Sequence, residues 1–279
     1  MPGTPTLVQT GKDQYCFIGA ADGSTPVSCG IVKSGSREAE IENIEMHGIG
    51  SSDAQEQRPG LVVPSGSIDF FVRTTSKTLL QKANLTADAL PEFSIDCGTI
   101  TAGKVHKYCK NSSVKVSAAF KGPFMGSFGW KGVQIAAGTP QADQAPGAGI
   151  TYMWHEGAIS VIGQKVREFV FTGNSDPEPE GGIGVSPRTD AKQREADAIV
   201  EGERKATLEV KLFAPTSIDY VADALAELAT VAITGTNGSD ILTLTLTGLM
   251  ITKEAMAMAS GKGAILYTVP FNVRSFAIT

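Results

Sequence analysis

The sequence predicts a mainly β fold (α+β) of two tandem modules, each a β-sandwich or barrel flanked by one short α-helix. Apolar and polar residues alternate in several segments, most regularly in the run LTLTLT at 242–247, as expected of strands with one buried face. The chain holds 31 glycines and only 7% aromatic residues, which favours β-structure with many turns. The order of strands and helix in the first half also recurs in the second.

The first module is predicted to span 1–138. Period-two alternation identifies its strands, and Thr75 or Ser76 is placed to cap the helix, with Leu79 and Leu80 as apolar anchors. In chain order we expect a hairpin at 15–36, a strand at 41–49, a polar loop at 50–60, a strand at 68–72, a short helix at 75–83 and strands at 93–100 and 112–120.

Residues 139–149 are rich in Gly, Pro, Ala and Gln without periodicity, which indicates a linker. The second module then spans 150–279. Its strands are predicted at 207–213, 231–236 and 242–247, with a helix after Pro215 whose apolar residues recur every three or four positions. We match 68–72 to 208–212, 93–98 to 231–236 and 114–120 to 242–248, so the repeat is one of element order rather than of identity.

The second module also contains the longest irregular segment, residues 174–204. It mixes Pro, Gly and charges of both signs. A loop of this length within a compact domain is usually functional or disordered, and one that orders on contact with a neighbour fits both descriptions.

Composition argues against several classes of protein. The net charge of −5 provides no global basic field for nucleic acid. No window approaches the roughly 20 apolar residues needed to cross a bilayer, and the amino-terminal residues have no secretory pattern, so we expect a protein made in a cytoplasm and not bound to membranes. The four cysteines are expected to be reduced thiols.

Motifs for chemistry are weak. Cys97, His106 and Cys109 lack the paired spacing and the fourth ligand of a zinc site. The SGKG at 260–263 lacks the remaining residues of a phosphate loop, and no GxSxG or strand-linked GxGxxG occurs. We therefore predict no catalytic residue, metal or cofactor, and a protein that is not an enzyme.

An acidic β-protein with one short helix per module, a long polar loop and a threonine-faced strand resembles the tail tube proteins of long-tailed bacteriophages. The resemblance is architectural, covers both halves and depends on no diagnostic motif. It implies a structural virion protein made in the host bacterial cytoplasm, which stacks as rings around a DNA conduit. Two modules per chain imply a trimer with pseudo-sixfold symmetry. A neutral or acidic bore would let DNA slide, because it does not attract phosphates.

The same resemblance implies where contacts lie. The implied partners are other copies of the chain and other tail proteins (terminator, tape measure and distal tail), with DNA passing through unspecifically. The loop 174–204, and less strongly 48–60, would contact neighbouring subunits or rings. The candidate loop residues are Asn174, Asp176, Glu178, Glu180, Arg188, Asp190, Lys192, Arg194 and Glu195. Candidates for a bore or a subunit seam are Thr243, Thr245 and Thr247, or their matched positions Lys115, Ser117 and Ala119.

Other functions remain open at this point. Within the structural class they are a tail terminator, a baseplate hub or a secreted injection-system tube protein of the same fold. From other classes they are a carbohydrate-binding or hydrolytic β-sandwich. The aromatic residues are scattered along the sequence, whereas a carbohydrate site needs them clustered.

Overall fold

The computed structural model describes residues 14–46, 56–99, 102–139, 149–161, 164–180, 196, 198–213, 227–238, 240–252, 255–257 and 266–279. Within them, antiparallel strands form most of the molecule and α1 (Thr74–Gln81) is the one α-helix. The prediction of a mainly β fold is confirmed. The helix predicted after Pro215 falls largely on 214–226, outside the described residues.

The first half contains the predicted hairpin, helix and strands, but two strands are longer than expected. The strands are β1 (Gln14–Gly19), β2 (Val27–Ser28), β3 (Val32–Met46), β4 (Glu56–Phe71), β5 (Phe93–Thr99), β6 (Ala102–Ala119), β7 (Met125–Lys131) and β8 (Gln134–Gly138). Residues 56–60, predicted as loop, belong to β4. The prediction failed there because Glu56 and Gln57 are exposed although they pair with β3, and an exposed strand has no apolar alternation to reveal it.

The second half begins with a 3₁₀ turn at Trp154–Glu156. Its strands are β9 (Gly157–Val161), β10 (Gln164–Asn174), β11 (Glu178–Glu180), β12 (Ala198–Val200), β13 (Lys205–Phe213), β14 (Leu228–Asn237), β15 (Asp240–Ile251), β16 (Ala255–Ala257) and β17 (Leu266–Ile278). The segment 174–204 is therefore not wholly irregular, because β11 and β12 pair as a short hairpin within it.

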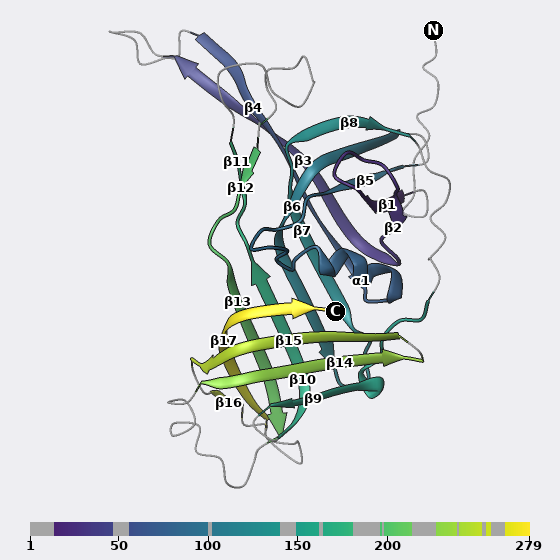
Figure 1. Ribbon diagram of the computed structural model, residues 1–279, viewed down its shortest axis with the longest axis vertical. Helices are drawn as coiled ribbons and strands as arrows, with labels where there is room; N and C mark the ends of the chain where they lie inside the picture. Colours follow the sequence, from purple (N-terminus) through teal and green to yellow (C-terminus); the bar gives the residue numbers. More distant parts are fainter. Residues whose placement is uncertain are drawn as a thin grey trace.

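Strand pairing in the second half closes on itself. The order β13–β17–β15–β14–β9–β10 is completed by direct pairing of β10 with β13. In Figure 1, β14, β15 and β17 cross the long strands β10 and β13. The result is a barrel-like sandwich of two crossing layers.

The two halves share one pairing scheme. β3 pairs with β4, β4 with β7, β7 with β6 and β6 with β5; likewise β10 pairs with β13, β13 with β17, β17 with β15 and β15 with β14. Both hairpins also carry a register shift near one end. The shift lies between the pairs Val32–Phe70 and Ser34–Asp69 in the first half, and between Val166–Leu212 and Glu168–Lys211 in the second.

The halves are joined by strand pairing. β6 runs antiparallel to β10 from the pair Ser113–Asn174 to the pair Ala119–Glu168. The sheet β3–β4–β7–β6 therefore continues into β10, β13 and β17 without a break in hydrogen bonding. Buried apolar side chains of both halves form one cluster, in which Phe124 packs edge-on against Phe169 of β10 with ring centroids 5.6 Å apart.

Helix α1 and the turn after it connect the first half to the end of the chain. Leu79 and Leu80 are buried, as predicted, and the Ser76 hydroxyl accepts a hydrogen bond of 2.7 Å from the Arg73 N–H at the start of the helix. Beyond the helix, the Asn84 side chain donates to the Ile278 carbonyl (2.7 Å) and accepts from the Ile278 N–H (2.8 Å). The helix thus holds the last strand against the first half.

Candidate assembly surfaces

One broad face extends over the sheet that joins the two halves. Residues opposite one another on antiparallel strands share a face, and Val114, Val116 and Ala118 of β6 point to the buried side. Lys115 and Ser117 therefore lie on the outer side. Tracing the pairs across the strands gives members of this joined-sheet face, among them Asp69, Phe71, Lys115, Ser117, Met125, Ser127, Glu168, Val170, Thr172, Thr207, Glu209 and Lys211.

Charge on the joined-sheet face is mixed. Lys211 Nζ lies 3.0 Å from Glu168 Oε2, so these two charges largely offset each other. Asp69 Oδ2 accepts a hydrogen bond of 2.8 Å from the Ser34 hydroxyl on β3. Glu209 and Lys115 are exposed on neighbouring parts of the same face. The face therefore presents hydroxyls and balanced charge rather than a basic field.

The threonine face of β15 belongs to the crossing layer. Leu242, Leu244 and Leu246 are buried, as the alternation predicts, whereas Thr243, Thr245 and Thr247 are partly exposed. Their cross-strand neighbours are also small and uncharged: Thr230, Ala232 and Thr234 on β14, and Ser275 and Ala277 on β17.

The structure does not bring the two predicted sets of seam residues together. Lys115 and Ser117 pair with β7 and β10, whereas Thr243–Thr247 pair with β14 and β17. The match of 114–120 to 242–248 also requires correction. The pair Lys115–Ser127 on β6 and β7 corresponds to Ala255–Thr268 on β16 and β17, so β16 is the counterpart of this part of β6.

The base of the long loop packs on its own chain. Asp176 Oδ1 lies 3.2 Å from Lys131 Nζ, and the Ser175 N–H donates to the Ser112 carbonyl at 2.9 Å. On the returning side, Glu201 Oε1 lies 2.7 Å from Lys110 Nζ and accepts the Leu90 N–H at 2.8 Å. Asn174, Glu178 and Glu180 are exposed on the outgoing side. The remaining candidates, Arg188, Asp190, Lys192, Arg194 and Glu195, lie outside the described residues.

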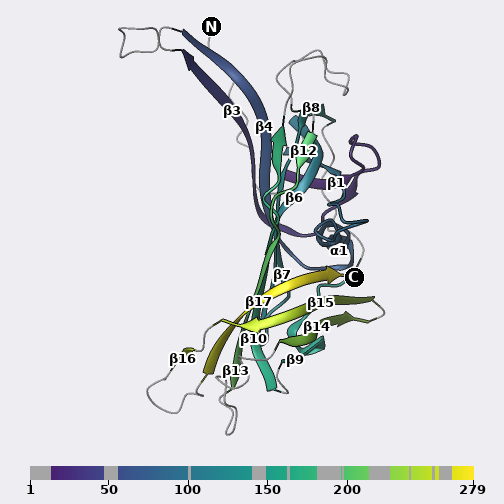
Figure 2. The same cartoon turned by 60° about the vertical axis from the view of Figure 1, so that its left-hand side comes forward.

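The hairpin β3–β4 projects from the body (Figure 2). Residues 33–40 of β3 are all exposed, and among the described strands β3 pairs with β4 alone. Sequence reasoning predicted a strand at 41–49, of which 41–46 belong to β3, but placed 56–60 of its partner β4 in a loop. The candidate loop 48–60 is described only from residue 56 onward.

Buried titratable groups serve packing. Trp130 Nε1 donates to His106 Nδ1 at 3.1 Å, and burial lowers the pKa of His106 to about 4, so the ring is neutral at pH 7. Burial also raises the pKa of the Cys109 thiol, which makes it a poor nucleophile. The described residues contain no group of three or more His, Cys, Asp or Glu side chains arranged to hold a metal ion.

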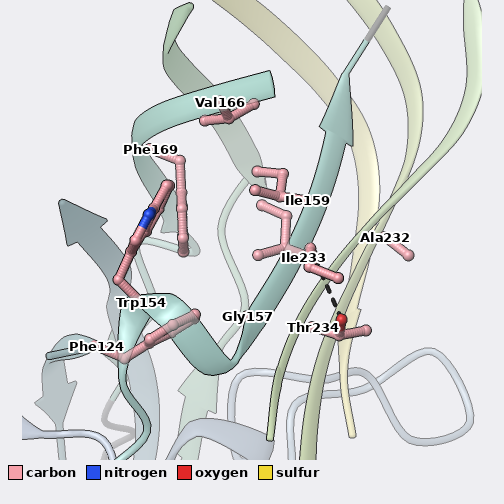
Figure 3. A pocket seen from close by; sticks show the side chains of 10 residues that line it. Phe124, Trp154, Gly157, Ile159, Val166, Phe169, Ala232, Ile233 and Thr234 are labelled. Atoms are coloured by element: carbon pink, nitrogen blue, oxygen red, sulfur yellow. Dashed lines mark hydrogen bonds between the residues drawn. The ribbon is translucent and has the colours of Figure 1, made fainter. Parts of the chain in front are cut away.

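A cavity of about 470 Å³ lies where the 3₁₀ turn meets β9, β10 and β14 (Figure 3). Trp154 stacks on Phe169 with centroids 6.4 Å apart, and Ile159 and Ile233 form the opposite wall. The Thr234 hydroxyl donates to the Ala158 carbonyl at 3.2 Å. No charged side chain lines this cavity, so it has no general acid or base.

The described part of the chain therefore contains extended strand edges and broad sheet faces, and its helix is too short to span a membrane. The family model for phage tail tube proteins matches residues 11–273, which is most of the chain. The chain belongs to the phage tail tube protein family. No curated protein matches it.

The family assigns a structural role in the virion tail and explains why surfaces dominate this chain. The predicted resemblance to phage tail tube proteins is confirmed. A tail tube protein associates with further copies of itself and with other tail proteins, and the edges and faces described above are candidates for its contacts.

Proposed function

We propose that this tail tube protein polymerises as stacked rings into the tube that conducts phage DNA. The family match over residues 11–273 carries the proposal. It is supported by the form of the molecule, which combines a broad sheet open at its β3 edge with a projecting hairpin. An exposed strand edge of this length favours pairing with another chain.

Each chain, in this proposal, supplies two tube modules, 1–138 and 150–279, connected by 139–149. Support comes from the shared pairing scheme and from the register shift that both hairpins carry. Three chains then form a ring with pseudo-sixfold symmetry, because each chain presents two equivalent modules.

The joined-sheet face, with Lys115 and Ser117, is our candidate for the bore. This is the sheet that continues from one half into the next, so it is the one able to continue around a ring. Its mixed charge suits a conduit, because a lysine-rich wall would hold DNA phosphates. Thr243, Thr245 and Thr247, on the crossing layer, then become candidates for a contact between copies.

The long loop and the β3–β4 hairpin are the proposed contacts between rings, and terminator, tape measure and distal tail proteins are the proposed partners at the tube ends. Because Ser175, Asp176 and Glu201 at the loop base bind their own chain, the part of the loop beyond this base is the candidate for reaching a neighbour. Replacing 181–195 by a short Gly-Ser linker should leave a folded subunit that forms rings but stacks poorly. Electron microscopy distinguishes single rings from tubes, and unimpaired tubes would count against this role.

The bore assignment is tested by labelling assembled tubes. In assembled tubes, Ser117→Cys should react with a small maleimide but not with a maleimide attached to a bulky protein. The bulky carrier cannot pass through the tube wall to reach a residue that faces the bore. The unassembled variant is the matched control and should react with both. Equal reaction with the bulky reagent in tubes contradicts the assignment. If wild-type protein stays monomeric under all assembly conditions, the tube proposal itself is contradicted.

A further inference from the structure

The junction between the two halves is a template for a contact between chains. β6 and β10 come from different halves and pair in a fixed antiparallel register, with Ser117 opposite Val170 and Lys115 opposite Thr172. If the halves are equivalent modules, β6 has a counterpart in the second half and β10 has a counterpart in the first half. In each counterpart, the edge that is paired in β6 or β10 is not covered by a described strand.

The counterpart of this part of β6 is β16. In the first half, adjacent residues of β7 pair with two strands: Gly126 with Phe70 of β4, and Ser127 with Lys115 of β6. In the second half, adjacent residues of β17 do the same: Tyr267 with Leu212 of β13, and Thr268 with Ala255 of β16. The register also shifts at the same place. The shift falls between Asn111 and Ser113 on β6, and between Ile251 and Ala255 where β15 gives way to β16. Ala255 and Ala257 thus correspond to Lys115 and Ser117.

The counterpart of β10 is β3. The shared register shift matches Val166 and Glu168 to Val32 and Ser34, so Val170 corresponds to Ser36 and Thr172 to Glu38. β10 is covered on both edges, by β6 and β13, and its inward-facing Phe169 and Phe171 are buried. In β3 the same inward positions are Gly35 and Arg37, and both are exposed. β3 therefore resembles β10 with one neighbour removed.

We propose that β16 of one chain pairs with β3 of a second copy in the register in which β6 pairs with β10, placing Ala257 opposite Ser36 and Ala255 opposite Glu38. The proposal rests on the tandem-module ring proposed above. Within the described residues, β16 pairs with β17 alone and β3 with β4 alone, so each of these two strands has an edge that no described strand covers. A head-to-tail contact of this kind repeats from copy to copy and closes when the rotation permits.

A second copy fits this edge better than an unrelated protein. The pairing within the chain already shows that two such edges are compatible in backbone direction and register. Three of the four residues that would be opposed, Ser36, Ala255 and Ala257, are small. Strand addition of this type derives its affinity from main-chain hydrogen bonds.

Cysteine pairs at four positions test the register. In-register pairs are Ser36→Cys with Ala257→Cys, and Glu38→Cys with Ala255→Cys. Off-register pairs recombine the same substitutions: Ser36→Cys with Ala255→Cys, and Glu38→Cys with Ala257→Cys. Directly opposed Cα atoms lie about 4.5–5.5 Å apart, within disulfide range, whereas diagonal positions lie about 7–8 Å apart. Mild oxidation of assembled protein should therefore give covalent oligomers about tenfold more efficiently for in-register pairs.

Two controls assign each outcome. Mixing the Ser36→Cys and Ala257→Cys single variants should give only two-chain products, which proves that the bond joins different copies. Wild-type protein controls for the native thiols, of which Cys16, Cys29 and Cys109 are buried. Rings or tubes in the microscope together with selective in-register bonds support the seam. Rings or tubes with absent or unselective bonds overturn the seam alone. Absence of any ring or tube, for wild-type protein as well, overturns the ring proposal and the seam with it.

Discussion

The hairpins β3–β4 and β10–β13 have the same register shift but different surroundings. β10 lies between β6 and β13, and the segment beyond it is tied down by Lys131–Asp176 and Lys110–Glu201. Among the described strands, β3 pairs with β4 alone, and the hairpin projects from the body. Two strand pairs with a similar register shift thus occur in different settings, one inside the joined sheet and one at its edge.

Side chains differ accordingly. Phe171 on β10 is completely buried and packs edge-on against Phe276 with centroids 4.9 Å apart. Its counterpart on β3 is Arg37, whose guanidinium donates to the Cys97 carbonyl. A large apolar residue is used where a neighbouring strand covers the position, and a charged residue is used where solvent reaches it.

The largest expected effect follows from this pair. Phe171→Ala should lower the free energy of unfolding by about 3–5 kcal/mol, because it removes a buried ring and leaves a cavity. Arg37→Ala at the counterpart position should cost under about 1 kcal/mol in the unassembled chain. Urea denaturation followed by circular dichroism measures both. Similar losses at the two positions would mean that β3 is an interior strand in solution.

The free energy of unfolding should depend on pH through His106, which lies in the first half. The folded pKa of His106 is about 4 against an ordinary value of 6.5, so its stabilisation is present above pH 6.5 and is lost as pH falls toward 4. Between pH 7 and pH 4 this amounts to about 3 kcal/mol. His106→Gln keeps an acceptor for Trp130 and does not titrate. Between pH 7 and pH 4, the free energy of unfolding of this variant should therefore fall by about 3 kcal/mol less than that of the wild type. Equal pH dependence of the variant and wild type contradicts the assignment.

The contact between helix and carboxyl-terminal strand is the next in size. Asn84→Ala removes both hydrogen bonds to Ile278 and leaves its backbone unpaired, so we expect a loss of about 1–3 kcal/mol. Hydrogen exchange should show β17 opening earlier than β3–β4, because only β17 depends on Asn84. Uniform loosening of both regions would show that the contact has no local role.

The smallest expected effect concerns the loop base. A double-mutant cycle on Lys110 and Glu201, whose side chains are only 12% and 24% exposed, should give a coupling of about 1–2 kcal/mol. The exposed pair Lys205–Glu203 is the matched control and should give about 0–0.5 kcal/mol. Equal couplings would mean that the loop base is as solvated as a surface ion pair.

Local patterns predicted the parts of the fold that local physics determines. The Leu/Thr alternation located β15 and its buried face, and the apolar spacing after Thr75 located α1. The match of 93–98 to 231–236 stays a prediction; both segments lie in strands that lead into a tight hairpin, β5 to β6 and β14 to β15. The sequence lacks catalytic motifs and predicts a structural protein, and the family match supports a structural role.

Strand partners could not be predicted, because pairing is non-local. Nothing in 113–119 indicates that it joins β10 in the other half. The erroneous match of 114–120 to 242–248 arose because a two-residue period fits any even displacement equally well. The counterpart β16 has only three residues, AMA, and no alternation to reveal it.

The β6–β10 pairing has a consequence for how rings nucleate. Two separate subunits lose translational and rotational freedom when they join, which costs about 4–15 kcal/mol. Strands on one chain have only a loop to close, a cost that grows slowly with loop length. If rings are built from tandem modules, every second junction is already made before any two chains meet. Such a protein needs fewer subunit encounters to complete a ring. An incomplete ring also has fewer junctions between chains at which it can dissociate.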